Sequence, residues 1–285
     1  MVLPALAYII LFNYKPMYGI LIAFQDYSLK KGVSGSTWVG LDNFRRVFSS
    51  YWFPIILKNT LQISILTLVL GFPIPIIFAL LVNELSGVKT KKFLQTVSYA
   101  PHFISTVVMC GIITLFLNPN TGVINLAIKA LGGDPVYFMQ DAKYFPWVYV
   151  ISGIWQDAGW GAIIYFAALS GVDKSLLESA QVDGANRIQR VIHINLPVLK
   201  PTIVIMFILR CGQLLSVGYE KVYLLQTTTN LSASEVISTY VYKMGLEKSD
   251  FAFSTAVGLF NNVVNVVLLL IVNAIAKKTS ESSLF

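Results

Sequence analysis

Charged side chains are scarce in this chain of 285 residues. Only 12% of the residues are Asp, Glu, Lys or Arg, whereas about a quarter are charged in soluble domains, and 55% are hydrophobic. Three uncharged runs, 59–83, 93–128 and 251–276, each exceed the roughly 20 residues that a helix needs to cross a hydrocarbon core. A soluble fold is therefore excluded, and the sequence predicts an all-α membrane protein.

Residues that commonly carry catalysis or bind metals are also few. The two histidines, His102 and His193, are far apart in sequence, and Cys110 and Cys211 lie in apolar segments without metal-ligand neighbours. The chain has no GxxxxGK[ST] phosphate loop and no carboxylates spaced for acid–base work. We therefore expect a chain that is not an enzyme and binds neither a metal nor a cofactor. Its net charge of +7 fits contact with anionic membrane lipid better than nucleic acid.

Six transmembrane helices are predicted within a single domain of residues 1–285. Lys15-Pro16 interrupts the first of them, and Pro73 and Pro75 predict a kinked or broken helix in the second. A signal peptide is the alternative for the first segment, but no basic leader precedes it and no small-residue cleavage site follows it. The approximate bounds of the six spans are 2–25, 54–82, 93–117, 147–170, 201–224 and 251–276.

The distribution of Lys and Arg predicts the orientation of the chain. With the N-terminus inside, the inner segments hold nine Lys and Arg in 47 residues, and the outer segments hold eight in 84. Basic residues concentrate on the cytoplasmic side of membrane proteins. Both termini are therefore predicted to be cytoplasmic, in the plasma membrane of a bacterium. The inner segments are 83–92, 173–200 and 277–285, and the outer ones are 26–53, 118–146 and 224–250.

The loop at 173–200 contains start and stop signals for two short helices. Asp173 is a predicted N-cap, and Gly184 breaks the helix that follows because glycine accepts backbone angles that strain other residues. Asn186 is the predicted cap of the second helix, and Pro197 is expected to end it. The sequence thus predicts a compact loop on the membrane surface, apolar beneath and polar above. The apolar positions are Leu176, Leu177, Ala180, Ile188, Val191 and Ile192.

This loop resembles the EAA motif of membrane subunits in ATP-driven importers. The motif is Glu-Ala-Ala, a Gly four residues after the second Ala, and then Ile-x-Leu-Pro. The matching residues are Glu178, Ala180, Gly184, Ile194, Leu196 and Pro197, with Ser179 in place of the first Ala. The resemblance implies a cytoplasmic coupling helix that docks into a cleft of a separate ATP-hydrolysing subunit. Together with Asp183, these residues form the predicted ATPase-coupling set.

Four further stretches resemble the permease group of carbohydrate importers that includes subunits for alginate, pectin-derived and other complex oligosaccharides. They read YKPMYGILIAFQDYS, WVGLDNF, IWQDAGWGAIIYFAALSGVD and GYEKVYLLQTTTNLSASEVISTYVYKMG. The resemblance implies a type I importer permease that forms half of a path for an oligosaccharide or polysaccharide fragment. The implied partners are a second homologous permease subunit in a heterodimer, two ATP-binding subunits that carry ATP and Mg, and an extracytoplasmic sugar-binding protein. That protein is expected to meet the loop at 226–250.

Polar and aromatic side chains within the spans are the candidates for the sugar path. Amides can make paired hydrogen bonds to hydroxyl groups, and aromatic rings can cover the apolar face of a sugar. Asp157 and Arg210 are each predicted near mid-depth and are expected to pair across helices. Packing between helices is the alternative role for all of these side chains. The path candidates are Asn59, Gln62, Trp155, Gln156, Asp157, Trp160, Tyr165, Arg210, Tyr219, Asn261, Asn262 and Asn265.

An ion-coupled secondary transporter of sugars is the alternative function. Such a carrier is expected to have internal repeats and carboxylates within the membrane. Apart from Asp157 and Glu220 the predicted spans lack carboxylates, and no repeat is visible. A membrane-embedded enzyme is a further alternative, which the missing catalytic signatures disfavour.

Overall fold

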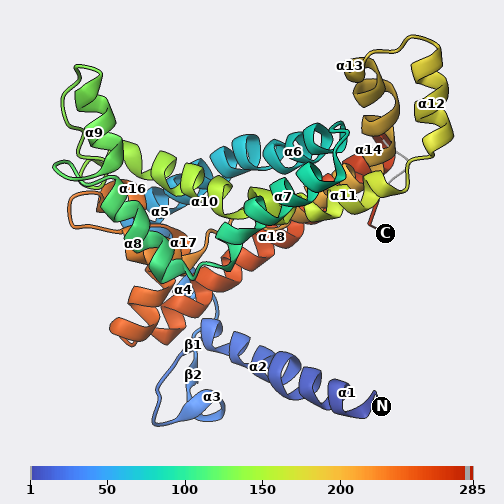
Figure 1. The fold of residues 1–285 in the computed structure, drawn as a ribbon. Helices are drawn as coiled ribbons and strands as arrows, with labels where there is room; N and C mark the ends of the chain where they lie inside the picture. Colours follow the sequence, from blue (N-terminus) through green and yellow to red (C-terminus); the bar gives the residue numbers. More distant parts are fainter. Residues whose placement is uncertain (1, 280–282, 285) are drawn as a thin grey trace.

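Long helices that run side by side make up the body of the protein (Figure 1). The computed structural model of the chain describes residues 2–279, 283 and 284. By length and composition, four helical segments can cross a membrane, or five if a pair bent by 99° counts as one span. The all-α fold class is confirmed, and the number of six spans stays a prediction. The segments are Leu3–Phe24, Trp52–Asn83, Arg187–Cys211, Phe251–Lys278 and the bent pair Val88–Phe103 with Thr106–Phe116.

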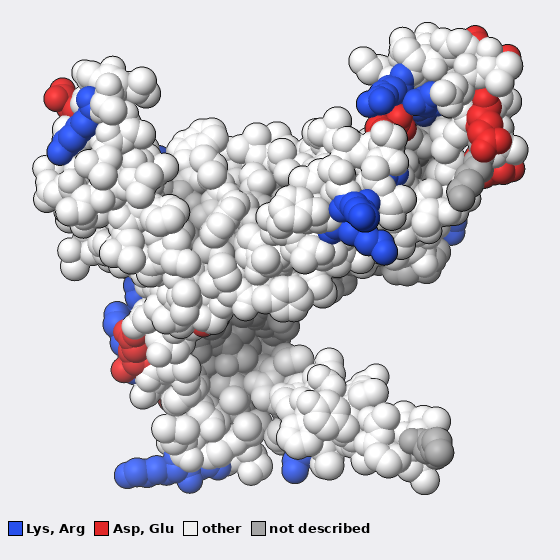
Figure 2. Space-filling model, in the orientation of Figure 1, with Lys and Arg blue, Asp and Glu red and all other residues white. Residues whose placement is uncertain are grey.

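The N-terminal arm stands apart from the body, with an open gap between them (Figures 1 and 2). It is helical throughout, so Lys15-Pro16 does not interrupt it as expected. A π-helical turn lies just before Pro16 and can absorb the N–H that proline lacks. The last part of the arm packs on the C-terminal helix. Its elements are α1 (Leu3–Ile9), η1 (Ile10–Tyr14), α2 (Lys15–Met17) and η2 (Tyr18–Phe24).

The second span contains the two prolines without a break. Its elements are α5 (Trp52–Leu66), the π-helical turn η3 (Thr67–Gly71) and α6 (Pro73–Asn83). The three elements form one helical segment of 32 residues. The π-helical turn directly before Pro73 again adjusts the bonding pattern where the proline ring enters. The local distortion expected from Pro73 and Pro75 is therefore a change of helix type rather than a broken span.

The third predicted span, 93–117, is not one helix. Its elements are α7 (Val88–Tyr99), η4 (Ala100–Phe103) and α8 (Thr106–Phe116), and the segments on either side of the break meet at 99°. Ser105 has extended backbone angles and caps α8, because its Oγ accepts a hydrogen bond from the N–H of Val108 (3.4 Å). Pro101 cannot donate a backbone bond just before this point. These two residues explain the bend.

The fifth predicted span, 201–224, is displaced in the structure. The helix begins at Arg187 inside the polar loop and ends at Cys211, where Gly212 and a series of turns follow. Pro197 does not end a helix, contrary to expectation, because a π-helical turn precedes it and the helix continues. The elements are α13 (Arg187–Arg190), η6 (Val191–Asn195), α14 (Leu196–Cys211) and α15 (Tyr219–Leu225).

The remaining long segments lie close to their predicted positions. The segment predicted at 147–170 divides at Ala162 into α10 (Phe145–Gly161) and α11 (Ile163–Ser170), and the last span is α18 (Phe251–Thr279). The polar loop that follows α11 contains α12 (Lys174–Val182). A short antiparallel pair of strands, β1 (Gln25–Asp26) and β2 (Thr37–Trp38), sets Gln25 opposite Trp38.

Shorter elements lie in the connections. A short helix, α4, lies between the first and second spans. The other connections contain α3 (Gly32–Gly35), α9 (Val123–Ala130), η5 (Ala142–Tyr144), α16 (Leu231–Ser234), α17 (Ile237–Tyr242) and η7 (Lys243–Glu247), and α4 itself spans Asp42–Ser49.

Charged side chains gather at opposite ends of the body. Figure 2 shows Lys, Arg, Asp and Glu over the α12–α13 loop and at the α9 end, with an uncharged surface between them. The start of α1 and the end of α18 lie toward the same end as α12 (Figure 1). This distribution is that of a membrane-integral protein whose central surface faces hydrocarbon.

Candidate functional site

The α12–α13 loop begins and breaks its helices where the sequence predicts. Asp173 Oδ1 accepts a hydrogen bond from the N–H of Ser175 (2.9 Å), which caps α12 and holds the pKa of the Asp173 carboxyl below its ordinary value. Gly184 has a φ of 82°, in the left-handed region that favours glycine. Asn186 and Gln189 exchange bonds of 2.8 and 2.9 Å in a capping box at the start of α13. Both predicted caps and the predicted break are confirmed.

The two faces of this loop differ from the expectation. Its underside packs on the helices through Leu177, Val191 and Ile194, which contact a buried cluster that includes Ala162 and Leu199. Four other apolar side chains are exposed, so the outer surface is not purely polar as expected. They are Leu176 (54%), Val182 (87%), Ile188 (70%) and Ile192 (49%), which we call the apolar patch of the loop. Several large apolar side chains exposed on one short loop make this loop a candidate surface for a partner.

A joint links the loop to the end of the second span. Arg190 Nη2 lies 3.4 Å from Glu84 Oε2, and Asn195 Nδ2 donates to Glu84 Oε1 over 2.9 Å. The side chains of Arg190 and Glu84 are 17% and 15% exposed, so water screens this ion pair only in part. We call these three residues the Glu84 joint. No local pattern indicates this contact, because Glu84 is 106 residues from Arg190.

The predicted coupling residues surround two hollows of the loop. Glu178 lines a hollow of about 370 Å³ together with Glu84 and Arg190. Ala180, Asp183, Gly184 and Ile194 line a second hollow of about 420 Å³. Ser179 Oγ donates to the carbonyl of Leu176 within α12 (3.1 Å), and Leu196 and Pro197 begin α14.

Two adjoining cavities lie within the body of the helices. The inner cavity, of about 420 Å³, extends along α10 and reaches Tyr165 and Arg210. The outer cavity, of about 550 Å³, lies between the bend of the third span and the start of α15 at Tyr219. Four residues line both cavities and form what we call the junction: His102, Gln156, Asp157 and Lys221. Six path candidates therefore lie around one continuous region: Gln156, Asp157, Trp160, Tyr165, Arg210 and Tyr219.

The predicted pair of Asp157 with Arg210 does not form. Asp157 Oδ1 instead lies 2.9 Å from His102 Nδ1. The imidazole of His102 also stacks on Trp160, with ring centroids 4.5 Å apart and planes within 7°. His102 lies in η4, directly before the bend, and both α7 and η4 pack on α10. Its partner Asp157 is 55 positions away, so no local pattern in the sequence indicates this pair.

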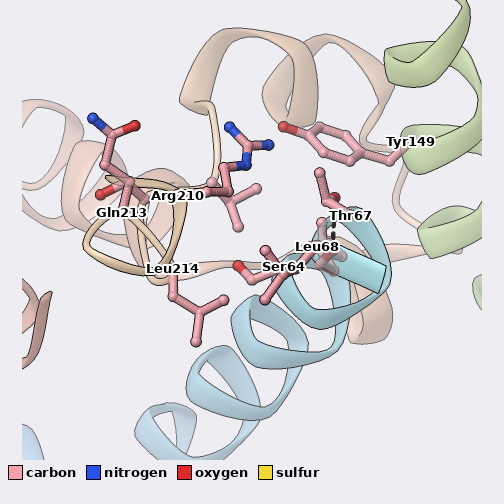
Figure 3. Close-up of a pocket in the computed structure, with 10 residues that line it drawn as sticks. Ser64, Thr67, Leu68, Tyr149, Arg210, Gln213 and Leu214 are labelled. Atoms are coloured by element: carbon pink, nitrogen blue, oxygen red, sulfur yellow. Dashed lines mark hydrogen bonds between the residues drawn. The ribbon is translucent and has the colours of Figure 1, made fainter. Parts of the chain in front are cut away.

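Arg210 lies instead at a small pocket of about 50 Å³ beside the inner cavity. Figure 3 shows its guanidinium group and the hydroxyl group of Tyr149 pointing toward one another above Thr67, with Ser64 below. Arg210 has no carboxylate within ion-pair distance in the part of the chain that the structure describes. It is a cation that faces a polar hollow.

The other six path candidates line neither cavity. Asn59 Nδ2 donates to the carbonyls of Ser232 and Glu235 (both 2.9 Å), and Asn265 bonds to the backbone N–H of Leu215 and to Ser216 Oγ (both 3.0 Å). These two amides bond long helices to connecting segments. They therefore have the packing role that was the alternative to lining the sugar path. The remaining four are Gln62, Trp155 and Asn262, which are exposed, and Asn261, which is partly buried.

The cavity residues that sequence reasoning missed include His102, Tyr149 and Lys221. His102 gave a signal, since it follows Pro101 and precedes the Ser105 cap at the bend. Lys221 gave a weaker one, as a cation beside Glu220 in a stretch that is mainly apolar and aromatic. Tyr149 resembles any interfacial aromatic residue and carried none.

The fold and the site define a membrane-integral subunit with a polar cavity between broken helices and a surface loop suited to docking. Comparison with known families agrees with this class. The chain belongs to the family of binding-protein-dependent transport system inner membrane components, whose model matches residues 71–281. It is thus a permease and a transport subunit, not an enzyme.

The most informative relatives match almost the full length. The polygalacturonan/rhamnogalacturonan transport system permease protein YteP of Bacillus subtilis is 44% identical over 285 residues, which are 100% of this chain and 89% of that protein. A crystal structure of a bacterial ABC transporter involved in the import of the acidic polysaccharide alginate matches with a TM-score of 0.91 and 40% identity, over 98% of this chain and 94% of the other. A second structure, of a bacterial alginate ABC transporter in complex with an alginate pentasaccharide-bound periplasmic protein, also gives 0.91, with 39% identity, 100% of this chain and 95% of the other. The type I importer permease fold is therefore confirmed.

Proposed function

We propose that this permease forms half of the translocation path for an oligosaccharide or polysaccharide fragment in an ATP-driven importer. The likeness over nearly the full length to proteins named for the transport of polygalacturonan and alginate supports this substrate class. The two adjoining cavities, of about 420 and 550 Å³, are in the size range of small-molecule sites. They supply the polar and aromatic lining that a sugar requires.

The α12–α13 loop is the proposed contact with an ATPase subunit. The observation that carries this proposal is the apolar patch, because Val182 and Ile188 are 87% and 70% exposed within the segment that has the EAA spacing. Docking of a partner would remove these side chains from water, which is favourable by about 25 cal/mol per Å². ATP and Mg are proposed to bind to two partner ATPase subunits, which then move this loop.

The other proposed partners follow from the exposed surfaces and from the relatives. A second homologous permease would complete a heterodimer, and lipid or that subunit would cover the apolar N-terminal arm. An extracytoplasmic sugar-binding protein is proposed to meet the loop at 226–250. With the α12 end facing the cytoplasm of a bacterium, both termini are cytoplasmic, in accord with the density of Lys and Arg.

Replacement of Gly184 tests the coupling role. At a φ of 82° a β-branched residue is strained, whereas a Cβ at this position meets no atom within 4 Å. In proteoliposomes with the complete importer, Gly184→Val is expected to lower ATP-dependent sugar uptake and sugar-stimulated ATP hydrolysis at least about tenfold. Gly111→Val is the matched control, because Gly111 also has open space around it but ordinary helical angles. Full uptake and stimulated hydrolysis by the Gly184→Val complex would refute the proposed coupling.

Membership of the family disfavours the alternative of an ion-coupled secondary transporter. The carboxylate at mid-cavity that such a carrier needs would be Asp157, which is bonded to His102. Uptake by this permease without its ATPase partners would restore that alternative.

A further inference from the structure

The outer loop proposed to meet the binding protein is bonded to α5, the first part of the second span. Asn59 Nδ2 donates to the carbonyls of Ser232 and Glu235 (both 2.9 Å). Thr60 Oγ1 accepts from the N–H of Ile237 (3.0 Å). Asn59 and Thr60 are only 5% and 0% exposed. Because hydrogen bonds shielded from water are costly to break, a displacement of the outer loop is passed to the second span.

The outer loop is itself held together by a shielded ion pair. Lys243 Nζ lies 2.5 Å from Glu235 Oε2 and also donates to Gln226 Oε1 (3.0 Å). Thr239 Oγ1 donates to the other oxygen of the same carboxylate, Glu235 Oε1 (2.9 Å). The side chain of Glu235 is only 4% exposed. These bonds join the end of α15 to α17 and η7, so a force on the surface of the loop moves it as one unit.

The other end of the same span is bonded to the α12–α13 loop. Glu84 follows α6 as its C-cap and contacts Arg190 and Asn195 in the Glu84 joint. Asn195 is 0% exposed, so this end is also shielded from water. The helix from Asn59 to Glu84 extends over roughly 37 Å, which exceeds the hydrocarbon core of about 30 Å. One helix therefore has attachments to both proposed docking surfaces.

Between these attachments the second span passes the inner cavity. Thr67 and Gly71 of the π-helical turn η3 line this cavity, and η3 packs on α10, which contributes Asp157 to the same lining. Single π-helical turns within a helix are frequent at functional sites. A displacement of the span therefore also moves one wall of the cavity.

We propose that the second span carries the signal from a docked, sugar-loaded binding protein to the ATPase subunits. Its attachments at Asn59, Thr60 and Glu84 are positioning contacts, which act through the helix and not on the sugar or ATP. The inference rests on the proposed function and adds the route that joins the two docking surfaces. The competing route is α18, which packs on both α14 and α17.

The test measures ATP hydrolysis by the complete importer in proteoliposomes, without binding protein and with binding protein saturated with trigalacturonate or trimannuronate. Asn59→Leu removes both bonds of that side chain to the outer loop. Glu84→Gln removes the ion pair with Arg190, and its amide oxygen can still accept from Asn195. Each variant is expected to lower the stimulation by loaded binding protein at least about fivefold, the lower end of typical coupling between sites. Gln62→Leu, at an exposed position of α5, is the matched control and should keep the wild-type stimulation.

Two further measurements separate a positioning role from a structural one. Glu84 lies at the opposite end of the span from the outer loop, so Glu84→Gln should bind the loaded binding protein as tightly as wild type in the absence of nucleotide. The double variant of Asn59→Leu and Glu84→Gln should be no more impaired than the worse single variant, because two breaks in one link have the effect of one.

Each outcome decides one of the two claims. Wild-type stimulation in Glu84→Gln, or a loss of binding-protein affinity that accounts for its lowered stimulation, overturns the proposed link. Additive losses in the double variant also overturn it, because the two attachments would then act on separate routes. A wild type that the loaded binding protein does not stimulate overturns the proposed function itself. If Asn59→Leu does not assemble, Thr60→Val decides, since it removes the bond to Ile237 with a side chain of nearly the same shape.

Discussion

The coupling loop and the junction of the cavities differ in how far apart their residues lie along the chain. The loop is shaped by bonds between residues two or three positions apart, as at Asp173 and Asn186. The junction combines residues from the bend of the third span, α10 and α15, and His102 and Asp157 are 55 positions apart. Local bonds determine the shape of the loop, whereas the junction depends on how whole helices cross. Substitutions in the two regions should therefore fail in different ways.

The largest effect is expected where α10 crosses α7. A Cβ at Gly159 would lie 2.1 Å from the backbone oxygen of Ser98, so Gly159→Ala must push the two helices apart. Overpacking of this kind costs about 1–3 kcal/mol, and here the obstacle is backbone, which cannot rotate away. We expect the melting temperature of the purified complex to fall and uptake to be lost, while amide exchange within α12 and α13 stays unchanged.

Gly258→Ala provides the control for that experiment. Gly258 lies in α18, and a Cβ there meets no atom within 4 Å. Its melting temperature should equal that of wild type or exceed it slightly, since alanine favours a helix over glycine. Equal losses for both variants, or faster exchange confined to the loop in Gly159→Ala, would contradict the separation of the two regions.

The same contrast explains which features the sequence could predict. The roles of Asp173, Gly184 and Asn186 can be predicted from the few residues around each of them. The long apolar runs likewise predict the long helices. Ser105 is a typical helix-capping residue at the bend. The residues on both sides of it are apolar, however, so the hydropathy pattern predicts one continuous span. The partner of Asp157 was missed for a different reason, since His102 lies 55 positions away and only the packing of whole helices brings the two together.

At three prolines the sequence predicts an interruption that the structure does not have. Each of Pro16, Pro73 and Pro197 follows a π-helical turn, and the helix continues through all three. The tendency of proline to end a helix predicts a helix end at Pro197. In the structure α14 packs against α11 and α18, and the helix continues. The sequence alone does not show that packing against neighbouring helices stabilises a helix that contains a proline.

The Glu84 joint links the loop to the end of the second span and should show an intermediate effect. Glu84→Ala, Arg190→Ala and the double variant form a cycle, and the shielding of both side chains predicts a coupling of about 1–2 kcal/mol. Glu84→Ala alone should be the more harmful single change, because it also removes the acceptor of Asn195. The measurement is the shift in thermal stability of the purified complex, with sugar-stimulated ATP hydrolysis as a second readout.

The exposed pair of Asp141 and Lys143 is the matched control for this cycle. Its side chains are 42% and 67% exposed, and each stabilises the charged form of the other. The hydrogen bond between them lowers the pKa of Asp141 and raises the pKa of Lys143. Water screens a pair this exposed, so it contributes little to stability. Additive effects at Glu84 and Arg190, no larger than at the control pair, would show that the loop is not held to the second span by this contact.

The smallest effect is expected at His102, where two interactions can be separated. His102→Phe retains a ring that can stack on Trp160 and removes the bond from Nδ1 to Asp157. The side chain of Asp157 is 63% exposed, so water can replace the lost partner and the cost should stay below about 1 kcal/mol. His102→Ala removes the stack as well and should cost about 0.5–1.5 kcal/mol more. Thermal stability of the purified complex measures both. If His102→Phe were as harmful as His102→Ala, the bond to Asp157 rather than the stack on Trp160 would hold the bend against α10. The junction would then depend on this hydrogen bond and not on aromatic packing.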